Sequence, residues 1–253
     1  MIELRDVSKD YGGVHAVKNL TLKLEERALL GLIGPNGAGK TTVLNAMTGL
    51  AAPSAGSIWF GDQRIERRKP HEIAALGVAR TYQTARIFPH MTALDNVVSG
   101  MHLKADDSLL GQLVCWPATL RGARRLRERA RALLEEVGLA ERAFVSARSL
   151  ALGEQRRLEL ARAIAADPKV LLLDEPAAGL NPVETKRLRD EIVRLTRERG
   201  ISILLVEHDM ALVMSACERI AVLDFGAKIA EGTPDEIRAN PRVVEAYLGA
   251  QTS

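Results

Sequence analysis

The chain has 253 residues, of which 47% are hydrophobic and 26% are charged, a composition typical of a globular protein with a substantial core. It carries 35 Lys and Arg residues against 32 Asp and Glu residues, and the resulting net charge of +3 is too small to indicate a nucleic-acid partner. No apolar run approaches the roughly 20 residues that span a bilayer, and the N-terminal residues mix acids and bases unlike a signal peptide. If the protein works at a membrane, we expect partners to hold it there.

The first part of the chain is predicted to form antiparallel strands. Leu20, Leu22 and Leu24 alternate with polar residues, which is the period-two pattern of a half-buried strand. Residues 57–60 and 63–65 flank a Gly-Asp turn and are predicted to pair as a hairpin. The region between these elements contains an apolar run at 28–33, which is short enough for a buried parallel strand.

A glycine-rich loop follows that run. The pattern G-x-x-x-x-G-K-[ST] is met here, and apolar residues then recur at helical spacing. Glycines let the backbone wrap closely round an anion, and the helix adds its positive end, so we predict a phosphate-binding loop. In such a loop Lys40 reaches the β- and γ-phosphates of a nucleotide, and the Thr41 hydroxyl binds Mg²⁺. The alternative is a glycine turn without a ligand. The predicted nucleotide-binding residues of the loop are Gly34, Pro35, Asn36, Gly37, Ala38, Gly39, Lys40, Thr41 and Thr42.

The middle of the chain contains one strand and then changes character. Residues 77–82 are predicted to form a strand that leads into Gln83. Residues 103–120 show no regular period, whereas 121–138 carry an apolar helical stripe opposite a row of arginines. That row is either a solvated face or a contact for acidic lipid head groups or a partner subunit. The arginines are Arg121, Arg124, Arg125, Arg127, Arg129 and Arg131.

The last hundred residues return to alternating strands and helices. Residues 170–173 and 201–206 are apolar enough to be strands buried on both faces, which is typical of a parallel sheet, and a helix is predicted between them at 183–199. A hairpin is predicted over 219–231, and the capping pattern at Thr233 opens a C-terminal helical segment. The fold class is therefore α/β, with a parallel sheet and an antiparallel β portion.

Polar residues follow the predicted strands. Asp174 and Glu175 come after the strand at 170–173, and open α/β sheets bind their ligands at the carboxyl ends of strands. We expect Asp174 to anchor Mg²⁺ and Glu175 to act as the general base toward an attacking water. Gln83 is placed to reach the metal or that water, and His208 to donate to the γ-phosphate as a neutral imidazole. The alternatives are a solvated acidic pair, a solvated amide and a structural histidine.

Together these residues resemble the nucleotide-binding subunits of ABC transporters, and the resemblance covers nearly the whole chain. It implies an ABC ATPase fold of the P-loop type that hydrolyses ATP with Mg²⁺. On the family's motifs, Gln83 is the Q-loop, Asp174 the Walker B acid, Glu175 the catalytic glutamate and His208 the switch histidine. The same resemblance implies that Tyr11 stacks on adenine.

The family's signature sequence, L-S-G-G-Q, corresponds to residues 150–154. In the family this motif opens a helix whose N-terminus faces the γ-phosphate bound by the other subunit of a head-to-tail dimer. Here alanine replaces the serine and removes its hydroxyl, and glutamate replaces the glutamine and adds a negative charge. The residues implied to act on the partner's ATP are Ala151, Leu152, Gly153 and Glu154.

Three features resemble the ATP-binding subunits of branched-chain amino-acid importers: the extended signature at 150–159, the run at 175–182 and the lengthened segment at 100–130. Asn181 stands where many family members carry aspartate, a change that this subfamily tolerates. The resemblance implies a second, related or identical ATPase subunit, two permease subunits and a periplasmic binding protein. The alternatives are another cargo (lipopolysaccharide export, urea or amide import), a soluble ABC ATPase without a transport role, and a regulatory subunit with little turnover.

On this resemblance we expect one ABC ATPase domain over 1–253, with a nucleotide core at about 1–83 and 157–253 and a helical signature subdomain at about 84–156. It also implies peripheral association with the cytoplasmic face of the inner membrane. Two cysteines without metal or disulfide spacing, Cys115 and Cys217, favour the same reducing compartment and are expected to be inert thiols. An apolar loop is the candidate contact for a permease subunit. The alternative is that the loop only packs locally. Its residues are Ile87, Phe88, Pro89 and Met91.

Overall fold

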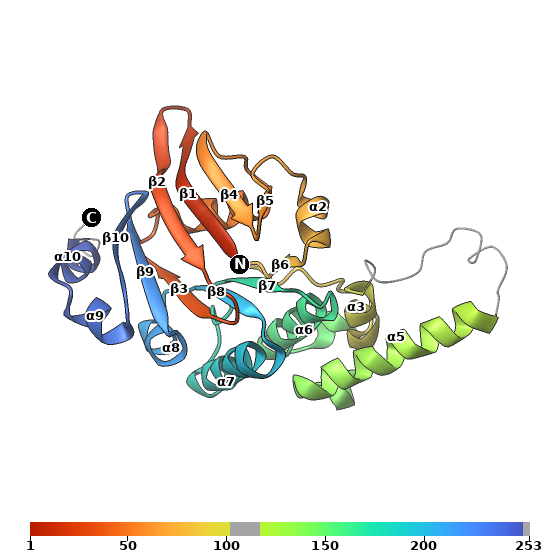
Figure 1. Cartoon of the computed structure of the whole chain (residues 1–253). Coiled ribbons are helices and arrows are strands. Elements are labelled where there is room, and N and C mark those ends of the chain that lie inside the picture. Colours follow the sequence, from red (N-terminus) through yellow and green to blue (C-terminus); the bar gives the residue numbers. More distant parts are fainter. Residues whose placement is uncertain (102–116, 250–253) are drawn as a thin grey trace. The chain divides into compact units, whose positions relative to one another are not determined.

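The computed structural model describes residues 1–101 and 117–249 (Figure 1). The chain forms two compact units, Met1–Gln83 with Lys169–Ser253, and Thr84–Pro168. The sequence-based predictions for Cys115 and for residues 103–116 fall outside the described residues.

An antiparallel sheet of four strands opens the first unit, in the order β2-β1-β4-β5. Its second strand has the predicted alternation, because Leu20, Leu22 and Leu24 are buried while the residues between them are exposed. The predicted hairpin about Gly61 and Asp62 is confirmed. The strands are β1 (Ile2–Tyr11), β2 (Val14–Leu24), β4 (Ala55–Phe60) and β5 (Gln63–Arg64).

The second sheet of this unit has six strands in the order β10-β9-β3-β8-β7-β6. Neighbouring strands from β9 to β6 run parallel, and every residue of β3, β7 and β8 is buried, as the apolar runs predicted. Only β10 is antiparallel, in the predicted hairpin with β9. The strands are β3 (Leu29–Ile33), β6 (Val78–Arg80), β7 (Val170–Asp174), β8 (Ser202–Val206), β9 (Arg219–Asp224) and β10 (Ala227–Gly232).

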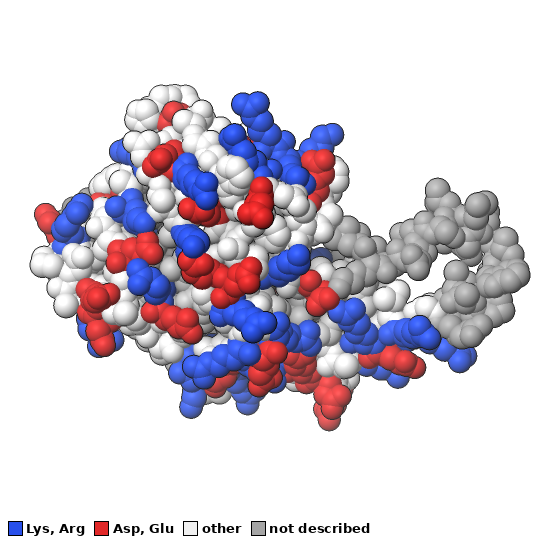
Figure 2. Space-filling model, in the orientation of Figure 1, with Lys and Arg blue, Asp and Glu red and all other residues white. Residues whose placement is uncertain are grey.

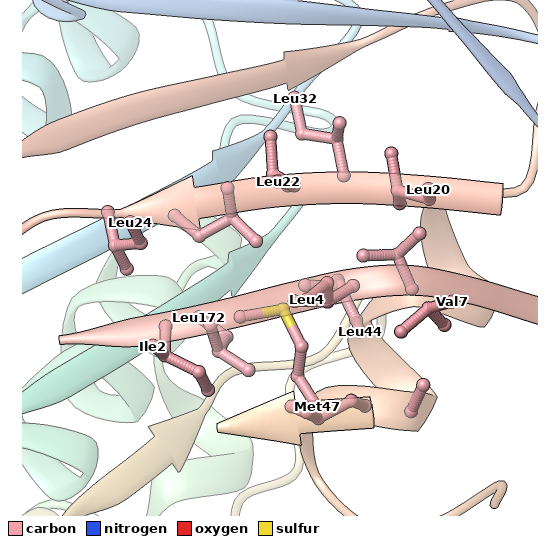
Figure 3. Close-up of a cluster of buried hydrophobic side chains, with 14 of the residues drawn as sticks. Ile2, Leu4, Val7, Leu20, Leu22, Leu24, Leu32, Leu44, Met47 and Leu172 are labelled. Atoms are coloured by element: carbon pink, nitrogen blue, oxygen red, sulfur yellow. The ribbon is translucent and has the colours of Figure 1, made fainter. Parts of the chain in front are cut away.

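The main core of the unit lies where the two sheets and helix α1 (Lys40–Met47) meet. Figure 3 shows Leu44 and Met47 of α1 beside Ile2 and Leu4 of β1 and near Leu172 of β7. All five side chains are at most 1% exposed. Burial of a side chain of this size stabilises a fold by about 1.5–3 kcal/mol. Since α1 begins immediately after the glycine loop, this packing also fixes one end of that loop.

Helices α7 (Pro182–Arg199) and α8 (Met210–Ala216) lie on the face of the six-stranded sheet away from the antiparallel sheet (Figure 1). Asn181 caps α7, since its Oδ1 accepts the N–H groups of Val183 and Glu184 at 3.0 Å each, and Gly200 ends the helix with φ 66°. The asparagine at this position therefore serves the helix as aspartate would. The remaining helices of the unit are α2 (Pro70–Ala75), α9 (Pro234–Ala239) and α10 (Pro241–Gly249).

The second unit is helical. Helix α3 packs on both α5 and α6, and Thr92 caps α3 by accepting the N–H of Asp95 at 3.1 Å. The unit extends to Pro168, whereas its end was expected near 156, and it includes the whole of α6, which contacts α3 and α5. Residues 117–120 were expected to be irregular but form the first turn of α5, where a leading proline is well tolerated. The elements among its described residues are α3 (Ala93–Ser99), α5 (Pro117–Glu136), α6 (Leu152–Ala165) and the 3₁₀ turns η2 (Ala140–Arg142) and η3 (Ala147–Ser149).

Acidic and basic side chains are interspersed over the face of the molecule drawn in Figure 2. This mixture is what a net charge of only +3 leads one to expect. Among the described residues, no helix combines the length and the apolar character needed to cross a membrane.

The thiol of Cys217 is buried directly after α8. Burial raises its pKa to about 12, and the neighbouring Glu218 carboxylate adds to the rise. Cys217 therefore stays protonated near neutral pH, in agreement with its prediction as an inert thiol.

Candidate functional site

The ends of four neighbouring parallel strands lie along one edge of the six-stranded sheet. The strand order β3-β8-β7-β6 brings together the glycine loop after β3, His208 after β8, Glu175 after β7 and Gln83 after β6. These are the segments that the sequence predicted to form one site. Their proximity follows from the parallel register, because each strand delivers its carboxyl end to the same edge.

The backbone of the glycine loop requires glycine at two positions in particular. Gly34 and Gly39 have φ values of 150° and 101°, which side chains with a Cβ rarely adopt. A Cβ at Gly34 would collide with the carbonyl oxygen of Leu223, and one at Gly39 with that of Ala16. The loop is therefore pressed against neighbouring backbone at both ends, which leaves it little freedom to change shape.

Lys40 is buried at the start of α1 and lies across the loop. Its Nζ donates to the carbonyl oxygens of Gly34 at 2.7 Å and Pro35 at 2.9 Å. Burial lowers the pKa of Lys40, and the carboxylates of Glu175 and Asp174 oppose that change. A largely buried ammonium group in a loop of this shape favours an anion beside it, which fits a phosphate group.

A cavity of about 810 Å³ borders the tip of the loop, and its volume falls within the range of roughly 300–1,000 Å³ common for small-molecule sites. Thr41 and Thr42 stand on the first turn of α1, where Thr41 is exposed. The loop is therefore open to solvent on the cavity side. The residues that line the cavity are Pro35, Asn36, Gly37, Ala38, Asp224, Phe225, Ile229, Arg242, Glu245 and Ala246.

Asp174 is a buried carboxylate with a buried ionic partner. Arg80 of β6 donates from one guanidinium nitrogen to Asp174 Oδ2 at 2.8 Å and from another to Asn45 Oδ1 of α1 at 2.7 Å. The side chains of Arg80 and Asp174 are only 4% and 6% exposed. Arg80 thus compensates the charge of Asp174, occupies one of its oxygens and connects strand β7 with α1.

The carboxylate of Glu175 joins the other two predicted catalytic residues. Gln83 Nε2 donates to Glu175 Oε2 at 2.7 Å, and His208 Nε2 lies 2.5 Å from Glu175 Oε1. Since an ionised carboxylate can only accept, this contact assigns the proton to His208 Nε2. Three residues that are far apart in the sequence therefore meet at one carboxyl group.

The backbone of Glu175 has an unusual conformation. Its φ of 48° lies in the left-handed region, which costs a residue with a side chain about 1–3 kcal/mol. The Glu175 N–H donates to Val206 O at 2.9 Å, and its carbonyl accepts the N–H of Ala178 at 3.2 Å. The surrounding hydrogen bonds thus hold a strained residue at the strand end, as is common at functional sites.

Tyr11 ends β1 with an accessible ring. The side chain is 47% exposed, and Lys9 Nζ lies 4.9 Å from the centre of the ring. An exposed aromatic face suits stacking on a nucleobase.

The signature residues lie at the N-terminus of α6 in the second unit. Glu154 Oε2 accepts the N–H of Ala151 at 3.0 Å, and its Oε1 accepts from Arg142 Nε at 3.1 Å. Leu152 is 46% exposed, whereas Gly153 is buried. The additional carboxylate of Glu154 therefore caps the helix and is compensated by Arg142, instead of projecting an unpaired charge from the helix end.

The apolar loop after Gln83 presents two exposed side chains, Phe88 at 46% and Met91 at 43%. Its backbone is fixed by Asn96, which is fully buried, donates to the carbonyl of Phe88 at 3.0 Å and accepts the Phe88 N–H at 2.7 Å. A rigid loop with exposed apolar side chains is a suitable surface for a protein partner.

Two buried charged residues beside the predicted site were missed from the sequence. Arg80 stands in a short strand otherwise composed of small and apolar residues, and Glu207 follows the fully apolar strand β8. Both are buried and both contact groups of the site. The sequence feature that could have identified them is a charged residue at the end of an apolar run. A charged side chain buried at such a place needs a partner.

A family model described as "ABC transporter" matches residues 17–178. The chain belongs to the ABC transporter family. A second model, described as "Branched-chain amino acid ATP-binding cassette transporter", matches residues 227–252 of this ABC ATPase. As a family member the chain binds and hydrolyses ATP, and the predicted family and fold class are confirmed.

Curated relatives match over nearly the full chain. The ABC ATPase is 46% identical to the high-affinity branched-chain amino acid transport ATP-binding protein BraF of Pseudomonas aeruginosa, over 98% of both chains. It is also 46% identical to the protein of the same description, LivG, of Salmonella typhimurium, over 94% of both chains. The lipopolysaccharide export system ATP-binding protein LptB of Escherichia coli is 33% identical, over 97% of this chain and 95% of LptB.

Solved structures share the fold. The ADP conformation of MJ1267, an ATP-binding cassette of an ABC transporter, matches with a TM-score of 0.84 and 27% identity over 98% of both chains. A dimeric post-hydrolysis state of the ATP-binding cassette MJ0796 bound to ADP and Pi matches with a TM-score of 0.79 and 26% identity, over 92% of this chain and 99% of that one.

The buried ion pair near the site gives a first prediction. Arg80→Met leaves Asp174 as an uncompensated buried charge, so we expect the free energy of unfolding to fall by about 3–5 kcal/mol. Urea denaturation measures this loss. Lys23→Met, which removes an exposed partner of Glu25, is the control and is expected to leave the urea midpoint unchanged. Adding Asp174→Asn to Arg80→Met should recover part of the loss; a further loss of similar size would contradict the ion-pair explanation.

Proposed function

We propose that this ABC ATPase powers the import of branched-chain or related amino acids. The observation that supports the cargo is the similarity of the whole chain to BraF and LivG, together with the C-terminal match at 227–252. The observation that supports the chemistry is the meeting of Gln83 and His208 on the carboxylate of Glu175. The lower identity to LptB favours import of amino acids over export of lipopolysaccharide.

ATP binds through the loop after β3. Backbone N–H groups of the loop and the N-terminal end of α1 hold the phosphates, and the ammonium group of Lys40 reaches the β- and γ-phosphates. Burial of Lys40 makes an anionic partner favourable for it. The exposed ring of Tyr11 stacks on adenine and orients the base.

Mg²⁺ would be held by oxygen atoms of Thr41, Asp174 and Gln83. Hydroxyl, carboxylate and amide oxygens are the ligands that Mg²⁺ prefers, so the donor set fits. When bound, Mg²⁺ neutralises negative charge that develops on the phosphate oxygens. Arg80 holds Asp174 Oδ2 and thereby fixes the orientation of this carboxylate.

Hydrolysis is assigned to Glu175 as the general base that takes a proton from the attacking water. Gln83 and His208 hold its two oxygens from opposite sides of the strand end, which restricts the carboxylate to one orientation. His208 is then placed to donate its Nε2 proton toward the γ-phosphate when the contact with Glu175 is exchanged.

The second half of the site comes from another ABC ATPase subunit, whose signature residues reach the γ-phosphate across a dimer. The dimeric state described for MJ0796 supports this arrangement. Two permease subunits hold the pair at the cytoplasmic face of the membrane, and the exposed loop with Phe88 and Met91 is the contact that we assign to them. A periplasmic binding protein delivers the cargo.

The role of Glu175 can be tested by an isosteric change. Glu175→Gln removes the base but keeps the shape, so ATP affinity should stay within about twofold while kcat falls by at least about a hundredfold. Steady-state ATPase assays and nucleotide titrations measure the two quantities. Glu218→Gln, at an exposed position outside the site, is the control. Near-normal turnover of Glu175→Gln would remove Glu175 from the role of base.

The role of Tyr11 is tested by removing its ring. Tyr11→Ala should weaken ATP binding by about fivefold to a hundredfold, the effect of losing roughly 1–3 kcal/mol of base stacking. Fluorescence titration with ATP measures the change. Phe144→Ala removes an aromatic ring that is 68% exposed elsewhere and should leave ATP affinity unchanged. Equal affinities for the Tyr11 variant and the parent would show that this ring does not hold adenine.

The cargo is tested in the assembled transporter. The complex of ATPase subunits, permeases and binding protein, reconstituted in vesicles, should accumulate labelled leucine or a related amino acid only with ATP on the cytoplasmic side. Stimulation of the ATPase rate by the loaded binding protein is the second readout. Transport of urea or an amide without amino-acid transport would replace the cargo, and negligible turnover under all conditions would favour a regulatory role.

A further inference from the structure

Glu207 is a buried carboxylate between the last residue of β8 and His208. Glu207 is only 3% exposed. The hydrogen bonds described for its carboxylate come from backbone N–H groups near the site. An acidic residue in such a place is costly to bury unless its oxygens are well satisfied.

The two oxygens of Glu207 face two different loops. Oε1 accepts the N–H of Ala177, in the segment after β7, at 2.7 Å. Oε2 accepts the N–H of His208 at 3.0 Å, and the N–H of Asp209 lies at 3.5 Å from the same oxygen. One carboxylate thus bridges the segment that follows Glu175 and the segment that carries His208.

The backbone donors compensate part of the cost of burying the charge of Glu207. Burial raises the pKa of Glu207, while the N–H groups of Ala177, His208 and Asp209 lower it and the nearby Glu175 carboxylate raises it further. Each N–H donor favours the ionised form and is itself satisfied by it. Loss of this acceptor would leave the buried N–H of Ala177 and the partly buried N–H of His208 without their partner.

The bridge shares His208 with the contact to Glu175. His208 Nε2 contacts Glu175 Oε1 through its ring, while the His208 N–H and the Ala177 N–H donate to Glu207. The Glu175 N–H is bonded to Val206 O in the same region. The distance between the imidazole and the catalytic carboxylate therefore depends on backbone positions that Glu207 holds.

We propose that Glu207 is a positioning residue, which holds the backbone of His208 against the segment after Glu175 and so fixes the imidazole on the catalytic carboxylate. This proposal rests on the roles assigned above to Glu175 and His208. In this proposal Glu207 acts through His208 and the backbone near Ala177.

The first test replaces one acceptor oxygen by a donor. Glu207→Gln should lower kcat by about tenfold or more while KM for ATP changes by less than about twofold, since the glycine loop is untouched. Glu66→Gln is the matched control, because Glu66 is also a buried carboxylate that accepts a backbone N–H, from Ile58, but lies in the antiparallel sheet portion. It should leave kcat unchanged. Wild-type turnover by Glu207→Gln would overturn the proposal.

A double-mutant cycle separates positioning from a general loss of stability. Once His208→Ala has removed the imidazole, adding Glu207→Gln should lower the single-turnover rate by less than about twofold further. If the two losses multiply instead, Glu207 does not act through His208 and the proposal is wrong. An active Glu175→Gln variant would reject the catalytic role proposed for Glu175. An inactive Glu175→Gln variant together with a fully active Glu207→Gln variant would reject only the positioning role of Glu207.

A measurement on the unmodified chain covers the case in which Glu207→Gln does not fold. Native-state amide hydrogen exchange should show that the Ala177 and His208 amides are protected and exchange with a common opening free energy, because one carboxylate holds both. Rapid exchange of either amide, or clearly different opening free energies for the two, would contradict the bridge.

Discussion

The hydrogen bonds that Gln83 and His208 donate to Glu175 connect the ends of three neighbouring strands. They form only because β6, β7 and β8 are parallel and in a register that ends all three at one edge of the sheet. The glycine loop joins them from β3, and its position is fixed by the core packing of α1. The strand order thus brings these residues together, and the hydrogen bonds between their side chains then fix their positions.

Buried charge is the second constraint on this edge. Lys40, Asp174 and Glu207 are all buried, and each has partners that offset its desolvation: loop carbonyls for Lys40, Arg80 for Asp174 and backbone N–H groups for Glu207. Such groups add little net stability, because the free-energy cost of desolvating each charge offsets most of the favourable interaction with its partners. They instead fix the local geometry, because a buried charge is stable only when the groups around it occupy a few specific positions.

Much of this arrangement could be predicted from the sequence, because apolar runs and the glycine pattern are local. The strands at 28–33, 170–173 and 201–206 and the loop between Gly34 and Thr42 are examples. The pairing of Arg80 with Asp174, the left-handed backbone of Glu175 and the bridge through Glu207 depend on contacts between distant segments. No periodicity encodes such contacts, and the extent of the second unit depended likewise on how α6 packs.

The two units divide the chemistry between them. The first carries the glycine loop and the proposed catalytic carboxylate, and the second carries the signature helix, whose Glu154 is paired with Arg142 and is therefore expected not to repel a phosphate strongly. The central claim is that Glu175 activates the attacking water. A structure of the assembled transporter trapped with ADP, Mg²⁺ and orthovanadate tests it most directly. We predict an apical vanadate oxygen within roughly 2.6–3.2 Å of a Glu175 oxygen, with His208 close to both; an apical oxygen beyond hydrogen-bond reach of Glu175 would contradict the claim.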